Sequence, residues 1–235
     1  MKIAIMNFSG NVGKTTVAAH LLKPRIPQAV VYSVESINTG ADASGLEVEK
    51  LKGKKFGSLV DAIMVLDDAI IDVGASNVED FMKNMQQYDG SHEEFDLFIV
   101  PTVKEKKVQA DTVNTILSLR TIGVPADKIR VVFNKVDNDD DLTDEFAAIF
   151  ALGQIKKECR VSTGAAIFNN EVFERLKAVQ KSLGDLSEDE TDYRAKMKAA
   201  TSEDEKQDAV TMIALQRLSK TANRNLDKVF EELTK

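Results

Sequence analysis

The sequence contains few of the features found in secreted or membrane proteins. Its 235 residues include one cysteine, Cys159, and no tryptophan. A single cysteine cannot form an internal disulfide, and it has no companions with which to bind zinc. No segment approaches the ~18 consecutive apolar residues of a transmembrane helix, and the apolar start at residues 3–6 is too short for a signal peptide. We therefore expect a cytoplasmic protein that does not engage the membrane.

Aromatic residues are also scarce, and acidic residues outnumber basic ones. Aromatic residues make up 6% of the chain, and the formal net charge is −7. Such a chain is not a general binder of polyanions. Lysines do gather at residues 50–55 and at Lys104, Lys106 and Lys107. A non-specific DNA surface built from both groups is therefore an alternative to the usual interpretation of such groups as solvated faces.

Short apolar runs alternate with helical patterns along the first 183 residues. The runs predict strands at residues 3–6, 29–35, 69–76, 95–102 and 128–137, with a short one at 159–163. Helices are predicted at residues 15–22, 56–68, 78–88, 110–123, 144–153 and 166–183. This alternation is typical of parallel βαβ units, and strands that are apolar throughout indicate a sheet covered on both faces. The sequence therefore predicts an α/β fold.

The C-terminal part of the chain has a different composition. Residues 184–208 are strongly charged and poor in large apolar side chains, which predicts a mobile loop or a solvated helical excursion. A lid or partner-binding insert is the alternative. Residues 209–233 then predict one long helix that packs on the sheet. We expect residues 1–235 to form a single domain in which 184–208 are a charged insert or mobile segment.

The sequence SGNVGKTT, which starts at Ser9, lies between a predicted strand and a predicted helix. A phosphate-binding loop needs small residues whose backbone N–H groups wrap the phosphates, a helix N-terminus, a lysine and a hydroxyl for Mg²⁺. Four residues meet these demands: Gly10, Gly13, Lys14 and Thr15. The pattern G-x-x-x-x-G-K-[ST] would place its first glycine at Phe8, so the strict pattern is missed by one residue. A glycine-rich turn with an incidental lysine is the alternative.

The loop resembles the deviant Walker A motif, K-G-G-x-G-K-[ST]-[ST], of the ParA/MinD superfamily of ATPases. Gly10 matches the first glycine, Asn11 replaces the second, and residues 13–16 match throughout. Ser9 stands where the family has the lysine that reaches into the partner's phosphates in an ATP-sandwiched dimer. Either another Lys or Arg replaces that lysine, or turnover is slow.

The resemblance implies a P-loop NTPase with a doubly wound, mostly parallel sheet and nucleotide at the carboxyl ends of the strands. It also implies ATP and Mg²⁺ as ligands and a homodimer that forms on nucleotide binding. Thr16 would contact the α-phosphate. The residues that would bind nucleotide through the loop are Ser9, Gly10, Asn11, Val12, Gly13, Lys14, Thr15 and Thr16.

Two carboxylates follow strands in the places where the family has acidic residues. Asp72 in AIIDVGAS matches a Walker B strand and would hold Mg²⁺ together with Thr15. Glu35 stands at the second Asp of the family's D-x-D strand end, with Ser33 at the first, and would orient the attacking water. A helix-capping aspartate and an exposed loop-edge glutamate are the alternatives. The predicted catalytic set is Lys14, Glu35 and Asp72.

The run RVVFNKVD offers two ways of reading a base. In the superfamily an asparagine at the position of Asn134 contacts adenine. Residues 134–137 also spell N-K-x-D, the guanine-reading motif of GTPases, in which Asp137 would accept hydrogen bonds from guanine. The sequence therefore leaves ATP and GTP open.

The segment FSGNVGKTTVAAHLL also looks like plasmid-stability proteins of the StbB type, which are ParA-like ATPases of conjugative plasmids. The resemblance covers roughly residues 1–180. It implies an ATPase with weak intrinsic turnover that acts in plasmid stability, partition or conjugation with a partner plasmid-stability or DNA-binding protein. One alternative is a GTPase of the related metallochaperone or targeting class. Another is a nucleotide-binding adaptor that barely hydrolyses, which Ser9 and Ser33 favour.

Overall fold

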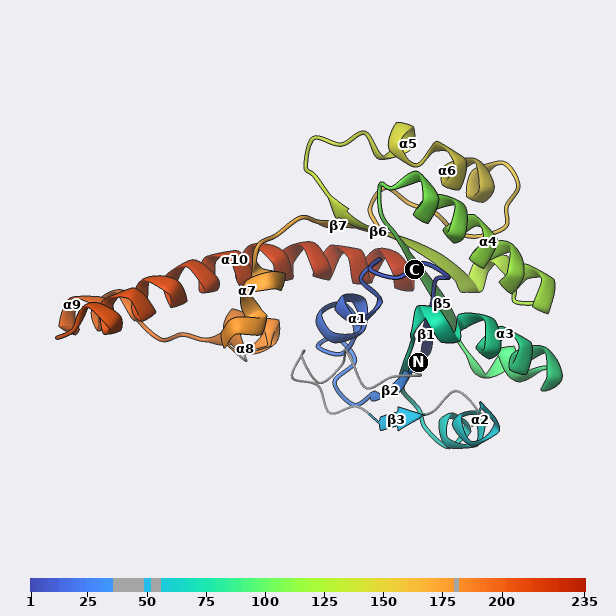
Figure 1. Cartoon of the computed structure of the whole chain (residues 1–235), viewed down its shortest axis with the longest axis horizontal. Coiled ribbons are helices and arrows are strands. Elements are labelled where there is room, and N and C mark those ends of the chain that lie inside the picture. The colour runs from blue at the N-terminus through green and yellow to red at the C-terminus, as the bar shows by residue number, and fades with distance from the viewer. Residues whose placement is uncertain (36–48, 52–55, 180–181) are drawn as a thin grey trace.

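A seven-stranded sheet forms the middle layer of the molecule (Figure 1). The computed structural model describes residues 1–35, 49–51, 56–179 and 182–235. The strand order is β3-β2-β4-β1-β5-β6-β7, and each of the six neighbouring pairs is parallel. The strands are β1 (Lys2–Ile5), β2 (Val30–Val34), β3 (Glu49–Leu51), β4 (Ala69–Val73), β5 (Leu97–Thr102), β6 (Ile129–Val136) and β7 (Ala166–Phe168).

The chain starts in the middle of the sheet and winds first to one side and then to the other, which confirms the expected doubly wound fold. One face is covered by α2 (Phe56–Met64), α3 (Val78–Gln87), α4 (Lys106–Ile122) and α6 (Ala147–Gln154). The other face is covered by α1 (Lys14–Thr16) with the π-helix η1 (Val17–Leu22), and by α7 (Val172–Val179), α8 (Leu183–Glu188) and α10 (Glu203–Thr234). Two further short helices are α5 (Leu142–Glu145) and α9 (Tyr193–Ala199).

Alternate residues of the central strand β1, together with Met6 directly after it, enter two separate hydrophobic cores. Ala4 and Met6 belong to the core under α2, α3, α4 and α6, whereas Ile3 and Ile5 belong to the core under η1 and α10. Successive side chains of a strand point to opposite faces, so an unbroken apolar run requires a sheet that is buried on both sides. All four side chains are fully buried, as the sequence predicts.

The charged segment 184–208 forms helices. It spans most of α8, all of α9 and the beginning of α10. The helix α10 begins at Glu203 and not near residue 209, because Ser202 and Glu205 form a reciprocal capping box that satisfies free N–H groups of the first turn. The C-terminal half of α10 packs on the sheet, while its N-terminal half projects from the body with α9 near its tip (Figure 1).

Two local predictions were wrong. Residues 166–168 form β7 and not helix, while residues 159–163 contribute only an isolated bridge between Arg130 and Arg160. Short apolar runs do not reveal their period, so pattern alone cannot assign them. Pro101 lies inside β5, as the predicted strand at residues 95–102 requires. Proline removes one ladder donor but keeps its carbonyl, and the carbonyl of Pro101 accepts a hydrogen bond from Asn7.

No helix within the described ranges combines the length and the apolar character needed to cross a bilayer.

Truncation of Phe98 tests the core beneath α2 and α3. Phe98 is fully buried and its ring centroid lies 5.1 Å from that of Phe95. We expect Phe98→Ala to lower the free energy of unfolding by about 3–5 kcal/mol, because it leaves a cavity. Urea denaturation measures the change. Val65→Ala, at a side chain that is 85% exposed, is the control and should stay within about 0.5 kcal/mol of the wild type. A loss below about 1 kcal/mol for Phe98→Ala would contradict this core assignment.

Candidate nucleotide site

The loop after β1 lies at the carboxyl edge of the sheet, next to the end of β4. Ile5 and Asp72 are paired in the register of these two parallel strands, and the first helix starts directly after the loop at Lys14. The Thr15 hydroxyl donates a hydrogen bond to Asp72 Oδ2 at 2.7 Å. The structure therefore brings together the two residues that the sequence predicts as Mg²⁺ ligands.

Two residues of the loop have left-handed backbone conformations. Gly13 has φ of 88° and Asn11 has φ of 58°, a region that glycine enters freely and that asparagine tolerates better than most residues. A Cβ atom at Gly13 would lie 2.1 Å from Asn134 Nδ2. Gly13 is therefore required for its backbone conformation and also for the close approach of Asn134.

The Lys14 side chain folds back into the loop. Its Nζ donates hydrogen bonds to the backbone oxygen of Ser9 at 2.8 Å and to that of Asn7 at 3.4 Å. Burial lowers the pKa of the Lys14 ammonium, while the negative charges of Asp72 and Glu35 oppose that shift. The acceptors of these two hydrogen bonds are neutral carbonyl oxygens. An anion that enters the loop can form stronger, charge-assisted hydrogen bonds with the Lys14 ammonium.

Asp72 is 4% exposed. Burial raises the pKa of its carboxyl group, and the hydrogen bond from Thr15 and the charge of Lys14 lower it. A hydroxyl and a carboxylate held together suit Mg²⁺, which is usually bound by one or two protein oxygens together with waters and phosphate oxygens. The donor set of Thr15 and Asp72 thus fits the ion that the resemblance implies.

Glu35, at the end of β2, is brought beside this pair. Gly74 N donates to the Val34 oxygen at 3.0 Å, and a Cβ atom at Gly74 would lie 3.2 Å from Glu35 Cγ. Ser33 pairs with Asp72 in the register of β2 and β4. The predicted catalytic residues Lys14, Glu35 and Asp72 therefore converge on one edge of the sheet.

Polar residues of α4 anchor the start of the loop, and sequence analysis missed them. Asn7 is fully buried. Its Nδ2 donates to Thr112 Oγ1 at 2.8 Å and to the Pro101 oxygen at 2.9 Å, while its Oδ1 accepts from Ser9 N at 2.8 Å. Both the NH₂ group and the oxygen of this buried amide are thus hydrogen-bonded, as burial of a polar group requires.

The position of the missing family lysine is tied to the same helix. The Ser9 hydroxyl donates to Asp111 Oδ2 at 2.5 Å, and Phe8 N donates to Thr115 Oγ1 at 3.2 Å. The helix predicted at residues 110–123 contains Leu117, whose apolar side chain is 41% exposed. The signal that could have revealed this face is the i, i+3, i+6 recurrence of Gln109, Thr112 and Thr115, all of which are buried.

Asn134 in β6 contacts the loop directly. Its Nδ2 donates to the Val12 oxygen at 2.9 Å, and its Oδ1 accepts from Lys135 N at 2.9 Å. A pocket of about 360 Å³ opens next to it. The lining residues are Thr16, Asn134, Lys135, Phe168, Asn169, Asn170, Glu171, Phe173 and Glu174. The pocket adjoins the first helical turn after the loop, so it is the candidate site for a base.

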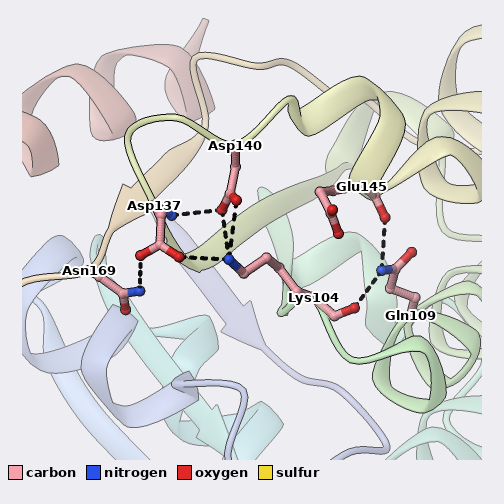
Figure 2. A network of polar contacts seen from close by, with 6 residues as sticks. All are labelled: Lys104, Gln109, Asp137, Asp140, Glu145 and Asn169. Carbon is pink, nitrogen blue, oxygen red and sulfur yellow. Dashed lines mark hydrogen bonds and ion pairs between the residues drawn. The ribbon is translucent and has the colours of Figure 1, made fainter.

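Asp137 is held in a separate polar network (Figure 2). Its Oδ2 accepts from Lys104 Nζ at 2.7 Å, and its Oδ1 accepts from Asn169 Nδ2 at 2.6 Å. Lys104 also pairs with Asp140 at 2.9 Å. Lys104 is therefore engaged with two acidic side chains, which weakens its predicted part in a DNA surface. Residues 52–55 and the side chain of Lys50, the other part of that surface, lie outside the described residues.

Two further ionisable side chains, Cys159 and His20, are buried. Burial raises the pKa of the Cys159 thiol to about 12, with a smaller contribution from the charge of Glu158. Burial lowers the pKa of His20 to about 4. Cys159 is thus a protonated thiol and His20 a neutral imidazole at neutral pH.

The fold is that of ParA/MinD-type P-loop proteins. MinD from Aquifex aeolicus, a cell division protein, superimposes with a TM-score of 0.55 and 12% identity over 93% of this chain and 96% of MinD. Apo McdA of Cyanothece gives a TM-score of 0.52 and 16% identity over 79% of this chain and 92% of McdA. A variant of Cyanothece McdA in complex with ATP gives 0.51 and 15% over 96% of each chain.

At the level of sequence, no family model and no curated protein matches the chain. The expected likeness to the ParA/MinD superfamily is therefore confirmed in the fold. The closer resemblance to StbB-type proteins stays a prediction.

The raised pKa of Asp72 predicts that a neutral side chain at this position makes the nucleotide-free protein more stable than the wild type at neutral pH. A carboxyl whose pKa is higher in the folded state favours folding below its unfolded pKa, and this contribution is lost as pH rises through the folded value. We therefore expect Asp72→Asn to have a higher urea midpoint than the wild type at pH 7, with the difference shrinking as pH falls toward 4. Asp67→Asn, at an exposed residue, should show no such pattern. A lower midpoint for Asp72→Asn at pH 7 would contradict the expected cost of burying this charge.

Proposed function

We propose that this chain is a nucleotide-dependent switch that binds ATP with Mg²⁺ and hydrolyses it slowly. The observation that carries the proposal is the 2.7 Å hydrogen bond between Thr15 and Asp72, beside the loop into which the Lys14 side chain folds. P-loop NTPases hold Mg²⁺ with a hydroxyl after the loop lysine and with a strand-end aspartate. The fold shared with the McdA variant in complex with ATP supports ATP as the ligand.

Each residue of the site then has a defined part. The backbone N–H groups of residues 10–16 and the ammonium of Lys14 bind the phosphates. Thr15 and Asp72 hold Mg²⁺, which neutralises charge on the phosphates when it is bound. Thr16 contacts the α-phosphate and Glu35 orients the attacking water. Catalysis of this kind depends on positioning and charge stabilisation.

Nucleotide binding requires a local rearrangement. Lys14 Nζ must leave the carbonyl oxygens of Ser9 and Asn7 in order to reach phosphate oxygens. The short Ser9 side chain, held by Asp111, carries no charge to offer a partner subunit. Slow intrinsic turnover follows from the missing charge, and a homodimer formed on nucleotide binding would need a cation from elsewhere.

The biological role that we propose rests on the loop motif and its StbB-type resemblance. It is a cytoplasmic switch in plasmid stability, partition or conjugation, whose nucleotide state controls a partner plasmid-stability or DNA-binding protein. Non-specific DNA is a second candidate partner. In the GTPase alternative, Asp137 would have to accept from guanine in addition to the hydrogen bonds that Lys104 and Asn169 already donate to it.

Replacement of Lys14 tests nucleotide binding. We expect Lys14→Ala to weaken Mg²⁺–ATP binding by about tenfold to a hundredfold, because it removes charge-assisted hydrogen bonds of about 1.5–3 kcal/mol. Titration calorimetry measures the affinity. Lys198→Ala, at an exposed lysine of α9, is the matched control. Equal affinities in the wild type and Lys14→Ala, or no ATP binding to the wild type, would contradict a P-loop site.

A measurement of phosphate release distinguishes an ATPase from a non-hydrolysing adaptor. It uses ATP and GTP with Mg²⁺, each with and without duplex DNA. We expect slow ATP turnover that DNA raises and that Glu35→Ala reduces about a hundredfold, since general acid–base contributions are about 10²–10⁴. ATP binding should be preserved in that variant. If turnover is undetectable under every condition and Glu35→Ala binds ATP normally, the non-hydrolysing adaptor is the better description.

A further inference from the structure

The side-chain amide of Asn169 has its orientation set by its neighbour. Asn169 follows β7 directly, and its backbone N–H donates to the Val136 oxygen at 2.8 Å. Its Nδ2 donates to Asp137 Oδ1 at 2.6 Å. An ionised carboxylate can only accept hydrogen bonds, so the NH₂ end of the amide must face Asp137 and the oxygen must face away. Figure 2 shows this arrangement.

Asp137 is in turn fixed as an ionised acceptor. Lys104 donates to its second oxygen at 2.7 Å, and its backbone N–H donates to Asp140 Oδ2 at 2.7 Å. The hydrogen bonds from Lys104 and Asn169 lower the pKa of the Asp137 carboxyl. The carboxylate therefore stays charged at neutral pH and accepts a hydrogen bond at each oxygen. A 180° rotation of the Asn169 amide would place its oxygen against this carboxylate, so the rotation is disfavoured.

The other side-chain amides of the pocket are already engaged at both ends. Asn134 donates to the Val12 oxygen and accepts from Lys135 N. Asn170 donates to the Leu218 oxygen at 3.4 Å and accepts from Val172 N at 2.9 Å. Within the described part of the chain, no donor contacts Asn169 Oδ1. Asn169 lines the pocket, so its oxygen is the amide acceptor that remains for a ligand.

We propose that Asp137 selects the base indirectly, by holding Asn169 so that Asn169 Oδ1 accepts a hydrogen bond from the 6-amino group of adenine. This inference rests on the nucleotide site proposed above. Adenine carries a donor at position 6, where guanine and hypoxanthine carry an oxygen acceptor. An oxygen fixed against that position favours adenine and repels the two oxo-purines, because two acceptors cannot share a hydrogen bond. Asp137 is a positioning residue in this scheme, and its N-K-x-D run does not contact guanine.

The test compares the affinities of ATP, inosine triphosphate, GTP and xanthosine triphosphate with Mg²⁺ for the full chain. We expect the wild type to bind ATP about tenfold more tightly than inosine triphosphate, the value of one hydrogen bond. Asn169→Ala should bring the ratio close to one. Asp137→Asn can donate to Asn169, which lets the amide turn its NH₂ to the pocket, so the preference should fall or invert. Asp139→Asn, at an exposed acid of the same turn, should keep the wild-type ratio.

The outcomes separate this inference from the proposed function. An equal affinity of the wild type for ATP and inosine triphosphate, or an unchanged ratio in Asn169→Ala, overturns the role of Asn169. GTP preference in the wild type that passes to xanthosine triphosphate in Asp137→Asn overturns the inference in favour of direct guanine reading, because an amide at position 137 would pair with the 2-oxo group. No binding of any nucleotide to the wild type would instead contradict the nucleotide site itself. If Asp137→Asn does not fold, as judged by circular dichroism, the ratio in Asn169→Ala decides.

Discussion

The hydrogen bond between Thr15 and Asp72 joins the two elements on which the site depends. Thr15 is fixed by the loop and the first helical turn, and Asp72 by the last part of a strand in the middle of the sheet. Both strands that lead to them run in the same direction in adjacent positions, so their carboxyl ends meet. The remaining site residues are arranged around this contact. Lys14 directly precedes Thr15, and Glu35 follows β2, the strand next to β4.

The site is built from groups that the fold holds at a cost in stability. Lys14 and Asp72 are both buried. Burial lowers the pKa of Lys14 and raises that of Asp72, so it favours the neutral form of each group. Such desolvated, preoriented charges interact strongly with a ligand that brings charge of its own. The polar face of α4 holds the loop in place through Asn7 and Ser9. The loop is thus anchored at its start by side chains and at Val12 by Asn134.

The two candidate base readers have different surroundings although they lie three residues apart. Asn134 is buried and holds the loop, whereas Asp137 lies beyond a backbone irregularity at Lys135, where φ is 55°. That irregularity, together with Lys104 and Asn169, determines what the Asp137 carboxylate can contact. The letters N-K-x-D do not encode these partners, because Lys104 lies in the segment after β5 and Asn169 in the segment after β7.

The sequence by itself determined the parallel α/β fold, the loop and the strand-end position of Asp72, because hydrophobic period and glycine spacing are local signals. It could not reveal that α4 presents threonines to the loop, since apolar spacing hides a polar buried face. It also misassigned β7, which is too short to show a period. Only the tertiary structure decided the partners of Ser9, Asp137 and Asn169. Their contacts join residues 32 to 102 positions apart, and such contacts depend on strand order, which no local pattern of residues contains.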